Sequence, residues 1–203
     1  MSTVFLTITL LLWFLPSFAQ SDYNSKELQR RIELNTNYLD SASSPLHPDS
    51  LRSFIGLSYY DIDESYRLAV KVKKKLGASF TMATSSGKLK EFRQYAVLKF
   101  ALNGSKFKLP IYQNIKLMRN PLYRDYLFIP FTDLTNGSST YGGGRYIEAR
   151  IPKKGELLEL DFNKSFNPYC HYSTGYNCPI PPKENYLNRK IEAGEKLLYK
   201  SIH

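Results

Sequence analysis

The sequence is poor in cysteine, histidine and tryptophan. Its 203 residues include only 2 Cys, 3 His and 1 Trp. Two cysteines exclude a disulfide-dense scaffold, and the cysteines and histidines lack the spacing of a zinc site. Neither a Gly-x-Ser-x-Gly elbow nor a His-Glu-x-x-His motif occurs, so two common hydrolase signatures are absent. No dinucleotide-binding motif is present, and we therefore predict no metal and no cofactor.

Acidic residues are also scarce. The chain has 28 Lys+Arg against 18 Asp+Glu, a formal net charge of +10. Such a basic chain can favour anionic surfaces, for example acidic glycans, phosphorylated polymers or lipid headgroups. The densest basic run lies in residues 71–75, and scattered lysines that keep a domain soluble are the simpler interpretation. Nucleic acid is not expected as a partner, because no nucleic-acid-binding motif is present.

Charged side chains are absent from residues 1–19. An apolar run over residues 4–15 is shorter than the ~20 residues of a membrane-spanning helix, and the small residues Ser17 and Ala19 follow it. This pattern predicts a signal peptide that is cleaved after Ala19 and a protein that is exported, either periplasmic or secreted. Because no basic residue precedes the apolar run, a retained N-terminal anchor is the alternative. No later run approaches membrane length, so no transmembrane segment is expected after cleavage.

The remaining sequence predicts one domain with a helical start. We expect residues 20–60 to form a helical segment that packs on the domain. Within it, residues 21–40 have apolar residues at helical spacing, which are Tyr23, Leu28, Ile32 and Leu34. A short helix is predicted within residues 47–54, with Gly56 as a stop signal.

Residues 61–203 read as a β-rich domain. Hydrophobic alternation predicts strands at residues 66–73, 79–84, 95–102, 106–110, 111–117, 126–131, 145–151 and 157–162. Asn103 and Gly104 predict a tight hairpin that pairs Phe100 and Leu102 with Phe107 and Leu109. The fold class is therefore mainly β, an antiparallel barrel or sandwich with a short helical N-terminal segment.

A series of distinctive segments fills the C-terminal third. They are Phe131-Thr132-Asp133-Leu134-Thr135, Thr140-Tyr141-Gly142-Gly143-Gly144-Arg145-Tyr146, Leu160-Asp161-Phe162-Asn163, Asn167-Pro168-Tyr169-Cys170, Cys178-Pro179-Ile180-Pro181-Pro182, Asn185 and Ala193-Gly194-Glu195-Lys196. With Phe54-Ile55-Gly56-Leu57 and Ser58-Tyr59-Tyr60, they make the chain resemble a bacterial and archaeal family known only as domain of unknown function 1684. The resemblance covers nearly the whole mature chain and implies no activity.

Arg145 is the most informative charged residue. Period two places it on the apolar face of its strand with Ile147, Ala149 and Ile151. An inward guanidinium needs a carboxylate or a ligand anion, because an unpaired buried charge is costly. Two interpretations stay open, a structural ion pair and a ligand site, and the candidate partners are Asp133, Asp161 and Glu195.

A ligand site could form around the glycine triplet. Backbone N–H groups of Gly142, Gly143 and Gly144 could form an anion-binding nest, and Arg145 would add a bidentate fork. A tight loop that enters a strand is the simpler reading of the triplet. The predicted ligand-binding residues are Tyr141, Gly142, Gly144, Arg145, Asn163 and Asn185. Nearby tyrosines could stack on a sugar or fill ordinary strand positions; they are Tyr141, Tyr146, Tyr169, Tyr172 and Tyr176.

Cys170 and Cys178 lie eight positions apart in a loop rich in Tyr, Gly, Asn and Pro. A disulfide is the expected state in an oxidising compartment. Zinc binding with His171 and a reactive thiol are the alternatives.

The leading functional hypothesis is an exported protein that binds a small anionic or carbohydrate ligand in a polar pocket of its β-domain. One alternative is an envelope hydrolase with an acidic pair drawn from Asp133, Asp161 and Glu195. The other is a structural or interaction module without a small-molecule site. Neither the ligand nor the oligomeric state can be predicted from the residues.

Overall fold

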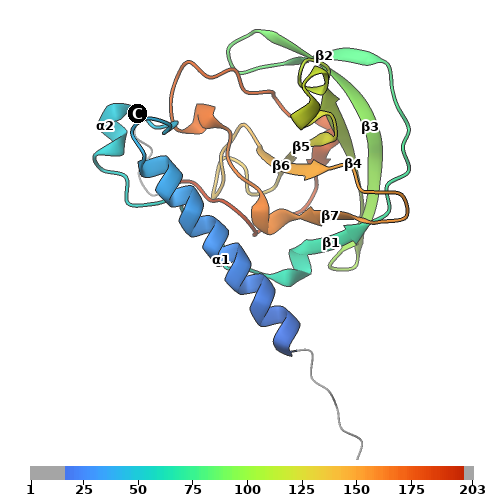
Figure 1. Cartoon of the computed structure of the whole chain (residues 1–203), viewed down its shortest axis with the longest axis horizontal. Helices are drawn as coiled ribbons and strands as arrows, with labels where there is room; N and C mark the ends of the chain where they lie inside the picture. The colour runs from blue at the N-terminus through green and yellow to red at the C-terminus, as the bar shows by residue number, and fades with distance from the viewer. Residues whose placement is uncertain (1–16, 199–203) are drawn as a thin grey trace, which may run out of the picture.

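A computed structural model describes residues 17–198, with side chains from residue 22 onward. The described chain starts with the long helix α1 (Ser17–Leu39) and the single-turn helix α2 (Pro48–Leu51), and then changes to strands (Figure 1). Most of the predicted leader, residues 1–16, lies outside the described residues. Cleavage after Ala19 would remove the first three residues of α1. None of the helices in the described part is both long and apolar enough to cross a membrane.

Strands form the rest of the domain. They are β1 (Arg67–Val70), β2 (Ser79–Ala83), β3 (Leu89–Leu102), β4 (Ser105–Asn114), β5 (Tyr126–Asp133), β6 (Arg145–Arg150), β7 (Leu158–Asp161) and β8 (Tyr186–Leu187). Single-turn 3₁₀ helices lie at Glu64–Tyr66, Leu117–Arg119, Pro121–Tyr123, Phe162–Lys164, Tyr169–His171 and Lys183–Asn185. The two strands predicted at residues 106–110 and 111–117 are one strand, because Pro110 continues the ladder opposite Val97.

The strands form two sheets. The larger has the order β2-β3-β4-β5-β6 with antiparallel neighbours, and β8 joins β5 in parallel. The smaller is the antiparallel pair of β1 and β7. A mainly β, antiparallel fold with an N-terminal helix is therefore confirmed. The expected barrel or sandwich is not confirmed, because no ladder among residues 17–198 closes the larger sheet into a barrel.

The β3–β4 hairpin forms at the predicted turn. Asn103 and Gly104 both adopt positive φ, 46° and 79°, as a two-residue hairpin turn requires. Phe100 pairs with Phe107 as predicted. The pairing of Leu102 with Leu109 is wrong, because the tight turn sets Leu102 opposite Ser105 and Leu98 opposite Leu109.

A register shift between Gln94 and Ala96 changes the alternation of β3. Such a bulge moves every later side chain to the other face. Phe92 therefore shares a face with Lys99 although the two residues are seven positions apart, a spacing that would put them on opposite faces of a regular strand. We call this side of the larger sheet the outer face.

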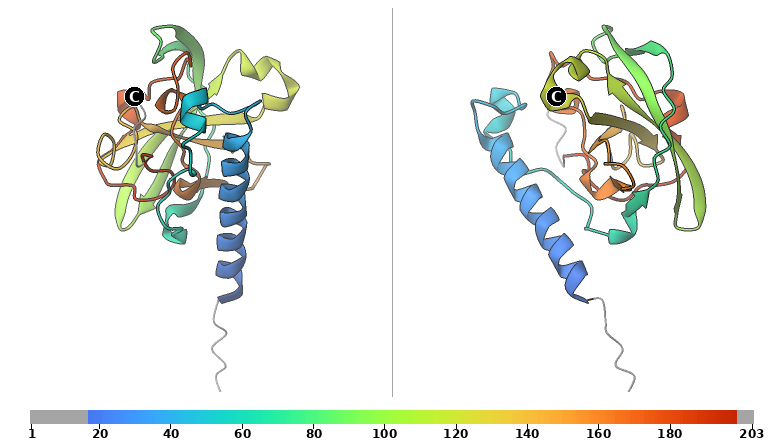
Figure 2. Two further views of the ribbon diagram at one scale, coloured as in Figure 1. Left: turned by 90° about the vertical axis from the view of Figure 1, so that its left-hand side faces the viewer. Right: turned by 45° about the vertical axis from the view of Figure 1, so that its right-hand side comes forward.

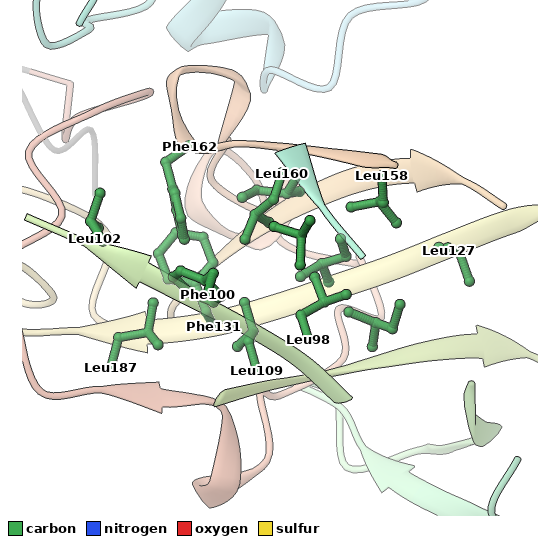
Figure 3. Packing of buried hydrophobic residues seen from close by; sticks show 14 of the residues in the cluster. Leu98, Phe100, Leu102, Leu109, Leu127, Phe131, Leu158, Leu160, Phe162 and Leu187 are labelled. Atoms are coloured by element: carbon green, nitrogen blue, oxygen red, sulfur yellow. The ribbon is translucent and has the colours of Figure 1, made fainter. Parts of the chain in front are cut away.

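The other face of the larger sheet bears the main core. Its leucine and phenylalanine side chains meet those of β7, and they fill the space between the two sheets (Figure 3). Each fully buried side chain of this size contributes roughly 1.5–3 kcal/mol. The fully buried members include Leu98, Leu109, Ile111, Leu127, Ile129, Phe131, Leu160 and Phe162.

Helix α1 packs along one side of the β domain (Figures 1 and 2). The predicted apolar stripe is wrong for Leu28 and Ile32, which are 55% and 50% exposed. Its other two members, Tyr23 and Leu34, are buried and half-buried. Other buried side chains of α1 are Glu27, Arg31 and Tyr38. The domain offers polar partners beneath the helix: Tyr23 Oη donates to Asp161, and Arg31 Nη1 donates to the carbonyl of Tyr60. A mainly polar helix face therefore holds α1 in place.

Candidate functional site

Two adjoining hollows mark the candidate site. The first, the aromatic cleft, lies on the outer face and has a volume of about 320 Å³. The second, the helix cavity, lies between α1 and the domain and also measures about 320 Å³. The two hollows share Glu148, Phe166 and Tyr169 in their walls.

Strands of the larger sheet build the floor of the aromatic cleft. Phe92 of β3, Phe128 of β5 and Tyr146 of β6 all point to the outer face, because alternation places them opposite the main core. The rings contact one another in sequence: Phe92 stacks on Phe128 at 5.5 Å, and Tyr146 meets Phe128 edge-on at 4.8 Å. These contacts hold the floor rigid.

Loop residues build the wall of the aromatic cleft. Phe166 forms two backbone hydrogen bonds with Tyr146 and extends the edge of β6. Tyr169 and Tyr176 pack together with ring centroids 5.2 Å apart. The predicted disulfide between Cys170 and Cys178 is present, and it closes the loop that carries Tyr176. The disulfide thus belongs to the wall of the cleft.

Polar groups are few in the aromatic cleft. Lys90 Nζ donates to the carbonyl of Asn177 at 2.5 Å, and burial lowers the pKa of Lys90. No ion pair of Lys90 is found in the part of the chain that the structure describes. Glu148 is exposed, and its carboxylate accepts a hydrogen bond of 2.8 Å from Tyr126 Oη. The cleft therefore presents one ammonium group and one carboxyl group among aromatic rings.

Glu195 is the notable residue of the helix cavity. It is 1% exposed, and its Oε2 accepts a 3.0 Å hydrogen bond from the backbone N–H of Asn167. Its Oε1 has no hydrogen-bond partner among the described residues. Burial raises the pKa of Glu195 to about 8, against the lowering effects of the Asn167 N–H and of Arg145. This carboxyl group is therefore mostly neutral at pH 7 and can donate a hydrogen bond.

More buried polar atoms around Glu195 lack a partner within residues 17–198. They are Tyr59 Oη, Arg31 Nη2 and Asn167 Oδ1. Tyr59 forms a backbone bridge with Glu195, and the Arg31 guanidinium lies 4.4 Å from the centre of the Tyr59 ring. Buried polar groups in folded proteins are almost always satisfied by protein, water or ligand. Among the described residues that line the helix cavity, Glu195 Oε1 is the one buried side-chain atom without a partner.

The predicted residue Arg145 lies elsewhere, in the interior. Its Nη2 donates to Asp133 Oδ2 at 2.9 Å, and both side chains are 0% exposed. The guanidinium also donates to the carbonyls of Ile191, Ala193 and Glu195. The structural ion pair, one of the two interpretations of Arg145, is therefore present, and Arg145 lines neither hollow.

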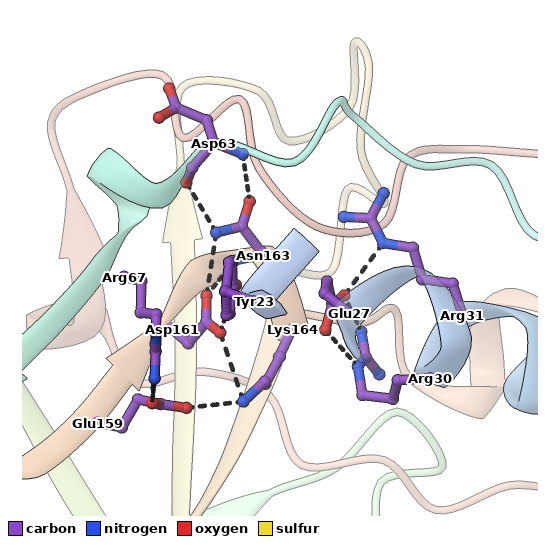
Figure 4. Close-up of polar contacts among 10 residues, drawn as sticks. All are labelled: Tyr23, Glu27, Arg30, Arg31, Asp63, Arg67, Glu159, Asp161, Asn163 and Lys164. Atoms are coloured by element: carbon purple, nitrogen blue, oxygen red, sulfur yellow. Dashed lines mark hydrogen bonds and ion pairs between the residues drawn. The ribbon is translucent and has the colours of Figure 1, made fainter. Parts of the chain in front are cut away.

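Asp161 and Asn163 belong to a second buried network (Figure 4). Asp161 accepts hydrogen bonds from Tyr23 Oη at 2.7 Å and from the backbone and side chain of Asn163. Asn163 also exchanges two hydrogen bonds with the backbone of Asp63. This network fastens α1 and the chain before β1 to β7, so both residues hold elements together.

The remaining predicted ligand residues are dispersed. Asn185 donates to the carbonyls of Pro110 and Pro130 and accepts from Tyr112 Oη, so it holds β4 and β5 where they separate. Gly144 has a φ of +90°, and a Cβ there would lie 2.7 Å from the carbonyl oxygen of Phe131. It serves the turn into β6. Gly142 is exposed on that turn, and the ring of Tyr141 packs against His171 at 5.1 Å.

The sequence interpretation missed Lys90, Phe92, Phe128 and Glu148. The bulge in β3 hid Phe92, since simple alternation from Leu98 puts it on the core face. The position of Glu148 could have been predicted from the alternation in its strand. Arg145 and Ile147 take the core face, so Glu148 takes the outer face. Of the five tyrosines considered for stacking, Tyr146, Tyr169 and Tyr176 line the aromatic cleft.

Comparison with known proteins places the chain in a family. The sequence pattern of the family described as "Protein of unknown function (DUF1684)" matches residues 52–196. The solution NMR structure of an uncharacterized protein from Haloarcula marismortui is similar, with 30% identity and a TM-score of 0.65. The alignment covers 88% of this chain and 96% of that chain. Comparison with curated proteins finds no match.

Proposed function

We propose that this chain, which belongs to the DUF1684 family, binds a small carbohydrate in its aromatic cleft. The observation that carries the proposal is the lining of the cleft. Seven aromatic side chains surround one ammonium and one carboxyl group, and they are Phe92, Tyr126, Phe128, Tyr146, Phe166, Tyr169 and Tyr176. Small-molecule sites are hollows of this kind, mainly apolar and aromatic with a few placed polar groups.

The mixture of groups favours a sugar over a wholly apolar ligand. Aromatic rings pack against the C–H faces of a sugar ring, while Glu148 and the tyrosine hydroxyls can bond its hydroxyl groups. Lys90 adds a positive charge without an ion-pair partner among the described residues. A sugar that carries an acidic substituent therefore suits the cleft better than a neutral one.

Export of the protein is part of the proposal. The leader predicted at residues 1–19 would direct it to the periplasm or the medium, where carbohydrate ligands of the envelope are available. The disulfide between Cys170 and Cys178 is consistent with an oxidising compartment. The mature protein would keep all 28 basic residues, because none lies in the leader.

A binding screen with a matched pair of variants tests the proposal. The probes are neutral sugars, amino sugars and uronic acids, as mono- and disaccharides, followed by calorimetry. Tyr169→Ala removes a ring that is 47% exposed in the wall of the cleft, and Tyr186→Ala removes one that is 46% exposed outside both hollows. We expect about a tenfold loss of affinity for Tyr169→Ala and no change for Tyr186→Ala. Equal loss in both variants, or no binding of any probe, would refute the proposal.

One observation favours a second function, glycoside hydrolysis. Of the acids predicted for an acidic pair, Asp133 and Asp161 are occupied by protein partners, while Glu195 shares the helix cavity with Glu148. Neutral Glu195 would give its proton to the glycosidic oxygen as the bond to the anomeric carbon breaks. Glu148 would accept a proton from the water whose oxygen bonds to that carbon.

Hydrolysis is tested separately from binding. Glu195→Gln and Glu148→Gln should each abolish the release of reducing ends from a bound oligosaccharide while the oligosaccharide still binds. Intact oligosaccharide after long incubation with the wild type would exclude hydrolysis and leave the binding proposal in place. A structural module without a ligand site would bind none of the probes.

A further inference from the structure

The positive charge of the chain is concentrated in one stretch. Residues 65–124 contain 14 Lys and Arg but a single acid, Glu91, whereas the rest of the chain contains 14 basic and 17 acidic residues. The stretch forms β1 to β4, and the long β3–β4 hairpin lies on the side of the domain away from α1 (Figures 1 and 2). The net charge of +10 therefore arises from one region, and it is not spread evenly.

Three lysines stand together on the outer face of this hairpin. Lys99 of β3 lies directly opposite Lys108 of β4, and Lys106 lies opposite Ala101. All three are exposed. Like charges directly opposite each other destabilise a strand pair. No ion pair compensates these lysines among the residues that the structure describes.

Two further lysines extend the same face. Lys74 forms a bridge with Ala96, and Lys75 N–H donates to the carbonyl of Tyr95 at 3.0 Å, so this segment runs beside β3. Ala96 faces the main core. Because side chains alternate along an extended segment, Lys73 and Lys75 take the outer face with Lys99. We name Lys73, Lys75, Lys99, Lys106 and Lys108 the lysine face.

A groove lies along the hairpin at three lysines of the lysine face. It has a volume of about 370 Å³ and is lined by Lys99, Lys106 and Lys108 together with Phe100, Ala101 and Phe107. The rings of Phe100 and Phe107 stack on each other at 5.7 Å on the main-core side of the hairpin, so they are not available to insert into a bilayer from the lysine face. A groove with charged borders suits a chain laid along it, whereas a bilayer surface is met by protruding apolar side chains.

We infer that the lysine face binds a linear polyanion, a polymer with an acidic group on every repeating unit. The backbone positions that carry neighbouring lysines are about 5 Å apart across the strand pair and about 7 Å apart along one strand. Such an array matches regularly repeated carboxylate or phosphate groups. Lysine offers a point charge rather than the fork of arginine, which suits recognition by charge and spacing. The inference stands apart from the aromatic cleft and does not depend on it.

Charge-matched variants of the full chain test the inference. The hairpin variant is Lys99→Gln/Lys108→Gln, and the control is Lys153→Gln/Lys154→Gln in the turn after β6. Each of them removes two exposed lysines. The probes are polygalacturonate for carboxylate polymers and inorganic polyphosphate for phosphate polymers. We expect the hairpin variant to bind at least one polymer about tenfold more weakly at low salt, with a shallower salt dependence, and the control to lose less than threefold.

Fold integrity is checked in the same samples. Removing the Lys99–Lys108 repulsion should leave the thermal midpoint unchanged or raise it, so weaker binding cannot be attributed to unfolding. Equal losses in the two variants would show unspecific charge attraction and overturn the inference. Absence of polymer binding by the wild type would also overturn it, as would binding only to phosphatidylglycerol vesicles.

Discussion

Arg145 and Asp133 form an ion pair that lies wholly inside the protein, with both side chains 0% exposed. The same guanidinium holds the carbonyls of Ile191, Ala193 and Glu195. Through these bonds, β5 and β6 fix the C-terminal segment against the domain. Glu195 is thereby placed in the wall of the helix cavity, so the ion pair supports the candidate site without touching it.

Loss of Arg145 should strongly destabilise the fold. Arg145→Ala would leave the Asp133 carboxylate buried without its partner, which costs about 3–5 kcal/mol. Arg150→Ala is the control, because its ion pair with Asp125 is about half exposed on both sides and is worth less than about 1 kcal/mol. Urea unfolding of both variants measures the difference. Similar small losses would contradict a structural role for Arg145.

Gly194 should tolerate no side chain. Its φ is +76°, and a Cβ would lie 2.6 Å from the carbonyl oxygen of Phe162 and 2.1 Å from Ser165 Oγ. Gly175 has a similar φ of +86° but open space around it. Gly194→Ala should therefore cost about 1–3 kcal/mol more than Gly175→Ala, because only the first is overpacked. Thermal unfolding of the two variants gives the comparison, and equal midpoints would contradict it.

Glu195 should make stability depend on pH. Its folded pKa of about 8 lies above the ordinary value of 4.5, so the folded state holds the proton more tightly than the unfolded chain. Stability should fall as pH rises from 5 to 8, by roughly 1.4 kcal/mol per pH unit from this group. Glu195→Gln should remove that part of the slope, whereas the exposed Glu156→Gln should retain it. Parallel pH profiles for the wild type and Glu195→Gln would show that Glu195 is ionised when folded.

The disulfide should matter for both stability and the aromatic cleft. Closing a loop between positions eight residues apart stabilises by about 2.5 kcal/mol on the chain-entropy relation. Cys170→Ser/Cys178→Ser should lose about this amount and should bind sugar more weakly, since Tyr176 lies in the released loop. Dithiothreitol should reproduce both effects in the wild type and have none in the variant. Unchanged sugar affinity after reduction would exclude the loop from the binding site.

Local patterns predicted much of the fold. Alternation located the strands, and the Asn103–Gly104 pair located the hairpin turn. The packing of α1 could not be predicted in this way, because the stripe of Leu28 and Ile32 faces solvent. Its buried face is chosen by partners distant in sequence, such as Asp161 and the carbonyl of Tyr60.

The candidate site was harder to predict than the fold. The burial of Arg145 followed from the face that it takes in its strand. The disulfide followed from the presence of two cysteines, close in sequence, in a chain expected to reach an oxidising compartment. The aromatic cleft gathers side chains from four strands and two loops, and one bulge decides which face Phe92 takes. Glu195 was named as a candidate acid, but its neutral state and its companion Glu148 arise only from tertiary packing.

The most direct measurement of the central proposal is NMR contact mapping on the protein saturated with a uronic acid or disaccharide from the binding screen. We predict intermolecular NOEs between sugar C–H protons and the ring protons of Tyr146, Tyr169 and Tyr176, and their loss in Tyr169→Ala. Contacts confined to the β3–β4 hairpin, or no contact at any tyrosine of the cleft under saturation, would contradict carbohydrate binding in the aromatic cleft.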